Sequence, residues 1–173
     1  IKICQYFYMT EKIGILGLGR MGSTAAHLLL ASGRKVFAVD RPSTRWLLDA
    51  GGKLVNSPRA LGEKTNILLV LLAREEDVEQ AIFGSQGLAE AEKKDLIVAD
   101  MGTFGVALKE RIYDTLTPSG VTVLDTPISG TPDAMKTKRA VIMASGDENA
   151  CEIIRPVLEV LASKCQYVGP FGH

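Results

Sequence analysis

The strongest constraint on the fold is a short glycine pattern near the start of the chain. It consists of Gly17, Leu18, Gly19, Arg20, Met21 and Gly22, which match G-x-G-x-x-G. An apolar run at residues 12–16 precedes the pattern, and a segment with helical spacing, residues 21–31, follows it. A second apolar run, residues 35–39, then leads into Asp40. A glycine triplet alone is weak evidence, but this order of strand, turn, helix, strand and acid is typical of a βαβ unit that binds a dinucleotide.

Each glycine has a separate physical role in such a unit. Gly17 permits the tight turn from strand to helix, Gly19 lets the backbone approach a pyrophosphate, and Gly22 lets the helix pack close to the sheet. The helix N-terminus presents unpaired N–H groups and a partial positive charge, which attract the same anion. We therefore expect residues 17–22 to bind the cofactor's pyrophosphate.

The residues after the second apolar run bear on the type of dinucleotide. Asp40 is placed to accept hydrogen bonds from the hydroxyls of the adenosine ribose, which favours NAD. Arg41 and Arg45 favour NADP if they pair with its 2′-phosphate. If they are ordinary surface charges, they do not discriminate between the two cofactors. The sequence predicts NAD and leaves NADP open. For Trp46, which lies near the same site, we expect core packing rather than stacking on adenine.

Apolar runs of strand length alternate with helical segments along the whole chain. Most runs are continuously apolar, which indicates burial on both faces of a sheet. The runs lie at residues 12–16, 35–39, 53–55, 66–72, 95–100, 121–126, 140–145 and 165–168. The helical segments lie at residues 21–31, 43–49, 58–63, 75–82, 104–116 and 148–162. The alternation predicts an α/β fold of the Rossmann type, a doubly wound, mostly parallel sheet with helices on both faces.

Length and composition narrow the alternatives. The 173 residues suit one domain, which we assign to residues 10–173. We assign residues 1–9 to an extension and interpret Met9 as the natural start of the protein. Lys plus Arg and Asp plus Glu number 20 each, so neither nucleic acid nor a membrane is an expected partner. No apolar run approaches the length of a membrane span. The three cysteines are odd in number and lack C-x-x-C spacing, which predicts no metal site and fits a cytoplasmic location.

Later blocks of the sequence carry a family resemblance in unbroken order. These blocks are "GILGLGRMGS" at 14–23, "NILLVLLAREEDVEQAIFGSQGL" at 66–88, "VADMGT" at 98–103, "DTPISG" at 125–130, "IMASGDEN" at 142–149 and "YVGPFG" at 167–172. The chain resembles the N-terminal half of the β-hydroxyacid dehydrogenases, which include 3-hydroxyisobutyrate dehydrogenase and are related to 6-phosphogluconate dehydrogenase. Such a half would bind NAD or NADP. The resemblance implies that Leu71, Leu72 and Ala73 form a loop beside the cofactor and that Thr103 lies near the nicotinamide ribose.

The same resemblance implies a substrate site. Ser129 and Gly130, with the adjacent Thr131, correspond to the turn that binds the carboxylate and hydroxyl of a short β-hydroxy acid. The family commonly has glycine where Thr131, Asp133 and Lys138 stand. We expect these departures to place a hydroxyl, a carboxylate and a cation around the mouth of the substrate site, which argues against 3-hydroxyisobutyrate itself as the substrate.

The expected catalytic base is not among the residues that match. In the family, a lysine from an all-helical C-terminal domain takes the hydroxyl proton. No lysine here stands in a matching position, so we expect that domain to be absent, the chain alone to be inactive, and a homo-oligomer to form only with the helical domain. We expect His27, on the helix after the glycine pattern, and the terminal His173 to play no part as bases.

Three functions remain open on the sequence. The favoured one is the cofactor-binding half of an enzyme that moves a hydride between nicotinamide and the hydroxyl-bearing carbon of a β-hydroxy acid. A second is oxidative decarboxylation of the 6-phosphogluconate dehydrogenase type. A third, from a different class, is a domain that binds a dinucleotide or a protein without turnover. The "DMGT" and "DTPISG" blocks argue against a methyltransferase.

Overall fold

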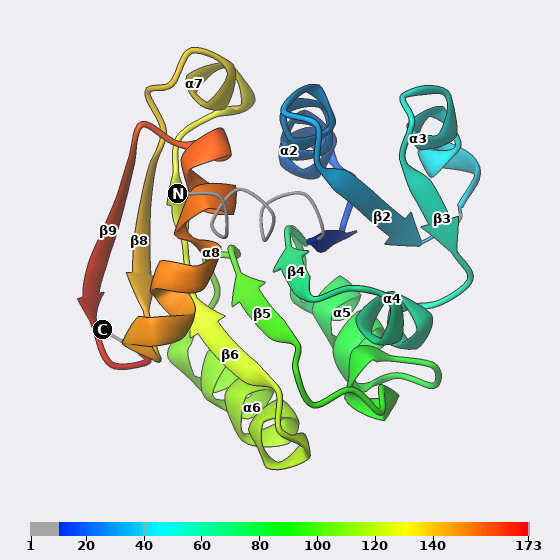
Figure 1. Ribbon diagram of the computed structural model, residues 1–173. Coiled ribbons are helices and arrows are strands. Elements are labelled where there is room, and N and C mark those ends of the chain that lie inside the picture. Colours follow the sequence, from blue (N-terminus) through cyan, green and yellow to red (C-terminus); the bar gives the residue numbers. More distant parts are fainter. Residues whose placement is uncertain (1–10, 40, 173) are drawn as a thin grey trace.

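A nine-stranded sheet runs through the part of the chain that the computed structural model describes, residues 11–39 and 41–172 (Figure 1). The strands are β1 (Lys12–Leu16), β2 (Lys35–Val39), β3 (Lys53–Val55), β4 (Ile67–Val70), β5 (Ile97–Asp100), β6 (Thr122–Asp125), β7 (Ile128–Ser129), β8 (Val141–Ser145) and β9 (Lys164–Gly169). Their order is β3-β2-β1-β4-β5-β6-β8-β7, and β9 pairs with β8. The pairs from β3 to β6 are parallel, whereas β8 is antiparallel to β6 and β7. The predicted doubly wound, mostly parallel sheet is confirmed.

The continuously apolar strands are buried on both faces, as their sequences indicated. In β4, Ile67 and Leu69 belong to one core cluster, while Leu68 and Val70 belong to another. Alternate residues of a strand point to opposite faces, so the two clusters lie on the two sides of the sheet.

Helices cover both faces. They are α2 (Arg20–Ala31), α3 (Trp46–Asp49), α4 (Pro58–Lys64), α5 (Glu75–Val78), α6 (Val106–Leu116), α7 (Pro132–Lys136) and α8 (Glu148–Leu161). Shorter turns are η1 (Pro42–Thr44), η2 (Glu79–Phe83), η3 (Leu88–Glu90) and η4 (Thr117–Ser119). Figure 1 shows α2, α3 and α7 at the top of the view and α4, α5 and α6 below them. The sequence did not predict β7 or α7, and the helix expected at residues 75–82 is a turn of α-helix followed by a π-helical segment, η2.

Backbone hydrogen bonds join the carboxyl ends of neighbouring parallel strands along one edge of the sheet. The N–H of Leu71 donates to the carbonyl of Leu16 at 2.8 Å, and the N–H of Met101 donates to that of Val70 at 3.0 Å. The N–H of Thr126 donates to the carbonyl of Asp100 at 2.8 Å. Open α/β sheets bind ligands at this edge. No helix in the described ranges is long and apolar enough to cross a membrane.

Candidate dinucleotide site

The glycine turn joins β1 to α2, and its three glycines meet three different surroundings. Gly17 has φ +104°, and a Cβ there would lie 2.6 Å from the carbonyl oxygen of Leu71. A Cβ on Gly22 would lie 1.8 Å from the carbonyl oxygen of Gly17, so only glycine lets the helix start this close to the strand. A Cβ on Gly19 would meet nothing within 4 Å. Gly19 is therefore the glycine that faces open space, where an external group can approach the backbone.

The N-terminus of α2 suits an anion. Gly19 is the N-cap and provides no side-chain hydrogen bond, and the first turn holds no acidic residue. The first helical hydrogen bond runs from Ser23 N–H to Gly19 carbonyl at 2.8 Å. The N–H groups before Ser23, including those of Arg20 and Met21, have no partner within the helix. These donors, the helix dipole and the positive charge of Arg20 together favour a phosphate group at this end.

A cleft of about 280 Å³ extends from the glycine turn between the ends of β1 and β2 and the start of η2. Its lining consists of Ile15, Leu16, Gly17, Leu18, Gly19, Ala38, Val39, Arg41, Ser43, Thr44, Leu72, Asp77, Gln80 and Ala81. The cleft thus brings Gly17, Leu18, Gly19, Arg41 and Leu72 together from the sequence-predicted set. Leu71 contributes its backbone to the turn, and Ala73 is exposed directly after the loop. Asp40 lies outside the described residues.

Sequence reasoning missed four polar residues of this cleft: Ser43, Thr44, Asp77 and Gln80. The hydroxyl of Thr44 accepts a hydrogen bond from the N–H of Arg41 at 2.9 Å and lies 2.9 Å from the carbonyl of Val39. It therefore fixes the turn that carries Arg41. Asp77 lies in α5, and it lines the cleft together with Val39 at the end of β2 and Arg41 after it.

Trp46 and His27 pack on each other rather than on the cleft. Their rings are stacked with centroids 4.3 Å apart and planes 1° from parallel. Trp46 also packs against the core cluster on the α2 side of the sheet, which confirms core packing. The Nδ1 atom of His27 lies 2.8 Å from the carbonyl oxygen of Ser23 in its own helix. His173 lies outside the described residues.

A buried ionic triad, which sequence reasoning missed, lies at the ends of β5 and β6. The Lys109 ammonium lies 3.1 Å from Asp100 and 2.5 Å from Asp125, and each of the three residues is less than a tenth exposed. Asp100 also accepts a hydrogen bond from the N–H of Gly102 at 3.0 Å. Burial raises the pKa of Asp100, which the nearby Lys109 ammonium lowers in turn. The signal available was an acid at the end of each of two apolar runs and a lysine on the intervening helix.

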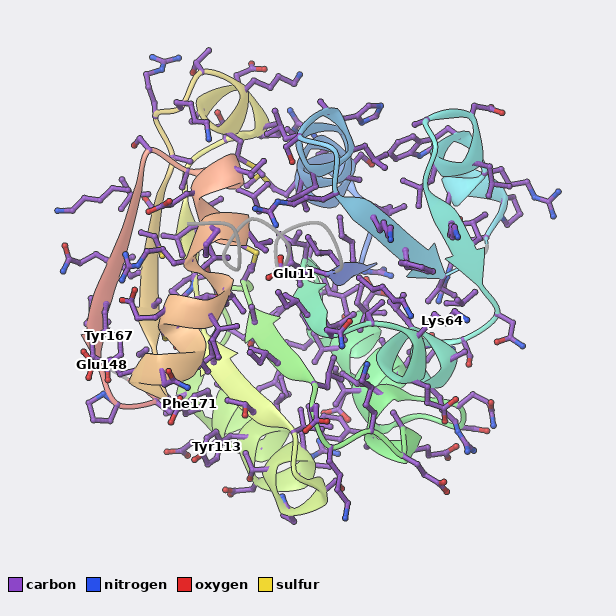
Figure 2. The ribbon with its side chains drawn as sticks, viewed as in Figure 1. Glu11, Lys64, Tyr113, Glu148, Tyr167 and Phe171 are labelled. Atoms are coloured by element: carbon purple, nitrogen blue, oxygen red, sulfur yellow. The ribbon has the colours of Figure 1, made fainter. Side chains whose placement is uncertain are left out.

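A second hollow of about 190 Å³ lies beside this triad. Thr103, Lys109, Asp125 and Phe171 are among its lining residues. The ring of Phe171 packs against that of Tyr113 in α6 with centroids 4.5 Å apart, and the two labelled side chains lie close together in Figure 2. Thr103 is therefore near the carboxyl edge of the sheet but in a different hollow from the glycine turn.

The turn expected to bind substrate follows β7. Ser129 and Gly130 are exposed, and Gly130 has φ +150°. Thr131 caps α7, where its hydroxyl accepts a hydrogen bond from the N–H of Ala134 at 3.2 Å. The side chain of Asp133 is 83% exposed and lies 3.7 Å from that of Lys136.

The prediction for Lys138 is wrong. Its ammonium donates to the carbonyls of Glu159 and Val160, the latter at 2.8 Å, in the last turn of α8. The C-terminus of a helix carries unpaired carbonyls and a partial negative charge, which explains why the cation binds there and not at the mouth of the substrate site. Among the described residues, no group of three or more His, Cys, Asp and Glu could hold a metal ion.

Comparisons with known proteins agree on the type of domain. Residues 12–169 match the family model described as the NAD binding domain of 6-phosphogluconate dehydrogenase. The chain is 32% identical to the L-threonate dehydrogenase of Cupriavidus necator over 163 residues, which are 93% of this chain and 55% of that protein. It superimposes with a TM-score of 0.83 on 3-hydroxyisobutyrate dehydrogenase from Salmonella typhimurium, at 29% identity, covering 93% of this chain and 57% of that one.

A further solved structure, Psf3 in complex with NADP⁺ and 2-OPP, gives a TM-score of 0.84 at 28% identity over 91% of this chain and 56% of that one. The chain thus spans a little over half the length of the curated relatives and solved structures that it matches.

Proposed function

Because this chain belongs to the family of the NAD-binding domain of 6-phosphogluconate dehydrogenase, we propose that it is the cofactor-binding half of an NAD(P)-dependent β-hydroxyacid dehydrogenase. The observation that carries the proposal is the glycine turn. Two of its glycines are required by close backbone contacts, and the third, Gly19, faces open space beside an uncapped helix N-terminus. This is the arrangement that a bound pyrophosphate needs.

The described residues divide the binding of a dinucleotide among them. Residues 17–22 hold the pyrophosphate through backbone N–H groups. Arg41 lies on the adenosine side, where its charge favours a 2′-phosphate. Asp40, which the sequence places after β2, is expected to favour a ribose hydroxyl and to exclude that phosphate. Leu71, Leu72 and Ala73 border the path toward the nicotinamide, and Thr103 binds near its ribose.

The substrate of the proposed reaction is a short β-hydroxy acid. Its carboxylate and hydroxyl bind at Ser129, Gly130 and Thr131, where a hydroxyl and turn N–H groups donate to an anion without adding a titrating group. Bound nicotinamide supplies the hydride chemistry, and the protein orients it against the substrate. The group that takes the hydroxyl proton is a lysine in the part of the relatives that this chain does not span.

The test is a fluorescence titration of the chain with NADH and NADPH, followed by turnover assays with a panel of small β-hydroxy acids. We expect NADH to bind and no hydroxy acid to turn over. A preference for NADPH would assign the 2′-phosphate to Arg41. A folded sample that binds neither cofactor would contradict the proposed function.

Gly19→Ala makes the test specific to the glycine turn. The added methyl group enters open space in the protein but occupies the place of the pyrophosphate, so NADH affinity falls about tenfold or more while the fold stays intact. Gly105→Ala is the matched control, because Gly105 also forms a helix N-cap and a Cβ there also meets nothing within 4 Å. The control should lose the same small amount of stability and retain its NADH affinity. Equal affinities in the two variants would contradict the assignment of residues 17–22.

A further inference from the structure

The outer part of the cleft has two walls of different chemistry. The wall after β2 presents Arg41 and the hydroxyl of Ser43. The other wall, formed by α5 and the start of η2, presents Asp77 from α5 and Gln80 and Ala81 from η2. In a fold of this kind the adenosine lies next to the end of the second strand, so an adenine ring placed here has these two walls on either side.

Asp77 is paired with a residue outside the cleft lining. The guanidinium of Arg74 donates to both carboxylate oxygens of Asp77, at 2.9 and 2.7 Å. A bidentate pair of this kind defines the orientation of the carboxylate as well as its position. Hydrogen bonding from Arg74 lowers the pKa of Asp77, so the group is an anion at neutral pH. A carboxylate accepts about four hydrogen bonds, which leaves acceptor sites on both oxygens for a ligand.

The two walls are also electrostatically related. Arg41 and Asp77 line the same cleft, and the charge of Arg41 makes a smaller contribution to the lowered pKa of Asp77. A guanidinium plane can cover the face of an aromatic ring, whereas a carboxylate can only accept hydrogen bonds at the ring's edge. Adenine offers both features, an electron-rich face and an exocyclic amine that donates two hydrogen bonds.

We propose that Asp77 accepts a hydrogen bond from the exocyclic amine of adenine, with Arg41 against the ring face, and so selects adenine dinucleotides over those with an oxygen at that position. The proposal rests on the proposed function, because it concerns the base at one end of the same cofactor. The proposal assigns recognition of the base to Asp77, which belongs neither to the glycine pattern at residues 17–22 nor to the acidic position after β2.

The probe is deamino-NADH, in which hypoxanthine replaces adenine. Its ring carries a carbonyl oxygen where adenine carries the amine, so at that position the Asp77 carboxylate meets an acceptor instead of a donor and the hydrogen bond to the amine is lost. A hydrogen bond to a charged group at a partly exposed site corresponds to a preference of about tenfold for NADH over deamino-NADH. The dissociation constants of both compounds are measured by fluorescence titration, and their ratio is the readout.

Asp77→Asn is the informative variant. It is isosteric, and its amide can donate to the carbonyl of hypoxanthine, so we expect the ratio to fall to about one or to reverse. Glu76→Gln is the control, because it removes the same charge from the preceding residue, which is exposed and does not line the cleft. The control should retain the wild-type ratio.

Each other outcome has a defined meaning. Equal affinity of the wild-type chain for the two compounds would overturn the inference and leave the proposed function in place. A preference for NADH that persists in Asp77→Asn would also overturn the inference, because another residue would then select the base. A preference that disappears equally in Glu76→Gln would overturn it too, because the selection would then come from the general negative charge of α5. Failure of the folded wild-type chain to bind NADH would overturn the proposed function and the inference with it.

Discussion

Replacing Lys109 by methionine should destabilise the protein more than an ordinary core substitution. Methionine retains most of the aliphatic length of lysine but removes the ammonium that lies 3.1 Å from Asp100 and 2.5 Å from Asp125. Two carboxylates at the ends of adjacent strands then share a buried site without that cation. Removal of one partner of a buried ion pair destabilises proteins by about 3–5 kcal/mol, and we expect a loss in that range at neutral pH.

The loss should depend on pH, with a definite sign. Burial already raises the pKa of Asp100 in the presence of Lys109, and loss of the ammonium raises that pKa further. A carboxyl group whose pKa is higher in the folded state contributes stability at low pH, and that contribution disappears as the pH rises through the folded pKa. The deficit of Lys109→Met relative to the wild type should therefore be smaller at about pH 5 than at about pH 8.

Urea unfolding followed by far-UV circular dichroism at the two pH values measures both effects. With a slope of about 2 kcal/mol per molar urea, the expected loss lowers the midpoint by about 1.5–2.5 M at the higher pH. Asp100→Asn is the control, because it removes one of the two carboxylates, keeps an oxygen to accept from Gly102 and leaves one anion for one cation. It should cost less than about 1 kcal/mol. A variant Lys109→Met with the wild-type midpoint, or with the same deficit at both pH values, would refute this account of the triad.

Two further predictions concern backbone geometry. Gly22→Ala places a Cβ 1.8 Å from the carbonyl oxygen of Gly17 and should lower the free energy of unfolding by about 2–3 kcal/mol, although alanine is the better helix former; an unchanged urea midpoint would contradict the close contact. Lys138 has φ +53°, a backbone conformation that strains any residue except glycine. Lys138→Gly should therefore be more stable than Lys138→Ala by about 1 kcal/mol in the same assay, because both variants lose the bonds to α8 but only alanine retains the backbone strain. Equal midpoints for these two variants would show that no strain is present.

The fold was predictable because its determinants are local. A continuously apolar run indicates a strand that is buried on both faces of a sheet. For β1, β4 and β5 this follows from each segment's own sequence, whichever strands lie beside it. The segments that escaped prediction are those too short to show a period. β7 has two residues and α7 has five, so neither gives a pattern that a turn could not also give.

The geometry of the glycine turn was predictable because a single segment makes it. Gly17, Gly19 and Gly22 act within a single strand–turn–helix unit, so their spacing carries the information. Asp77 and Lys109 depend instead on which distant segments meet. Lys109 occupies an ordinary position of the helix α6, and only the placement of β5 beside β6 puts two carboxylates next to it.

Thr131, Asp133 and Lys138 replace glycines that the family commonly has after β7. The structure leads to a different conclusion about these three residues than the sequence does. Two of the three substituted side chains are engaged by backbone groups at helix ends, since Thr131 caps α7 and Lys138 binds the last carbonyls of α8. Lys138 also retains the positive φ that glycine favours, so the backbone geometry is kept while the side chain is used elsewhere. Only Asp133 remains as a new charge, and its side chain faces solvent beside Lys136. The departures therefore give no argument against 3-hydroxyisobutyrate, and Ser129, Gly130 and Thr131 all remain exposed in this turn.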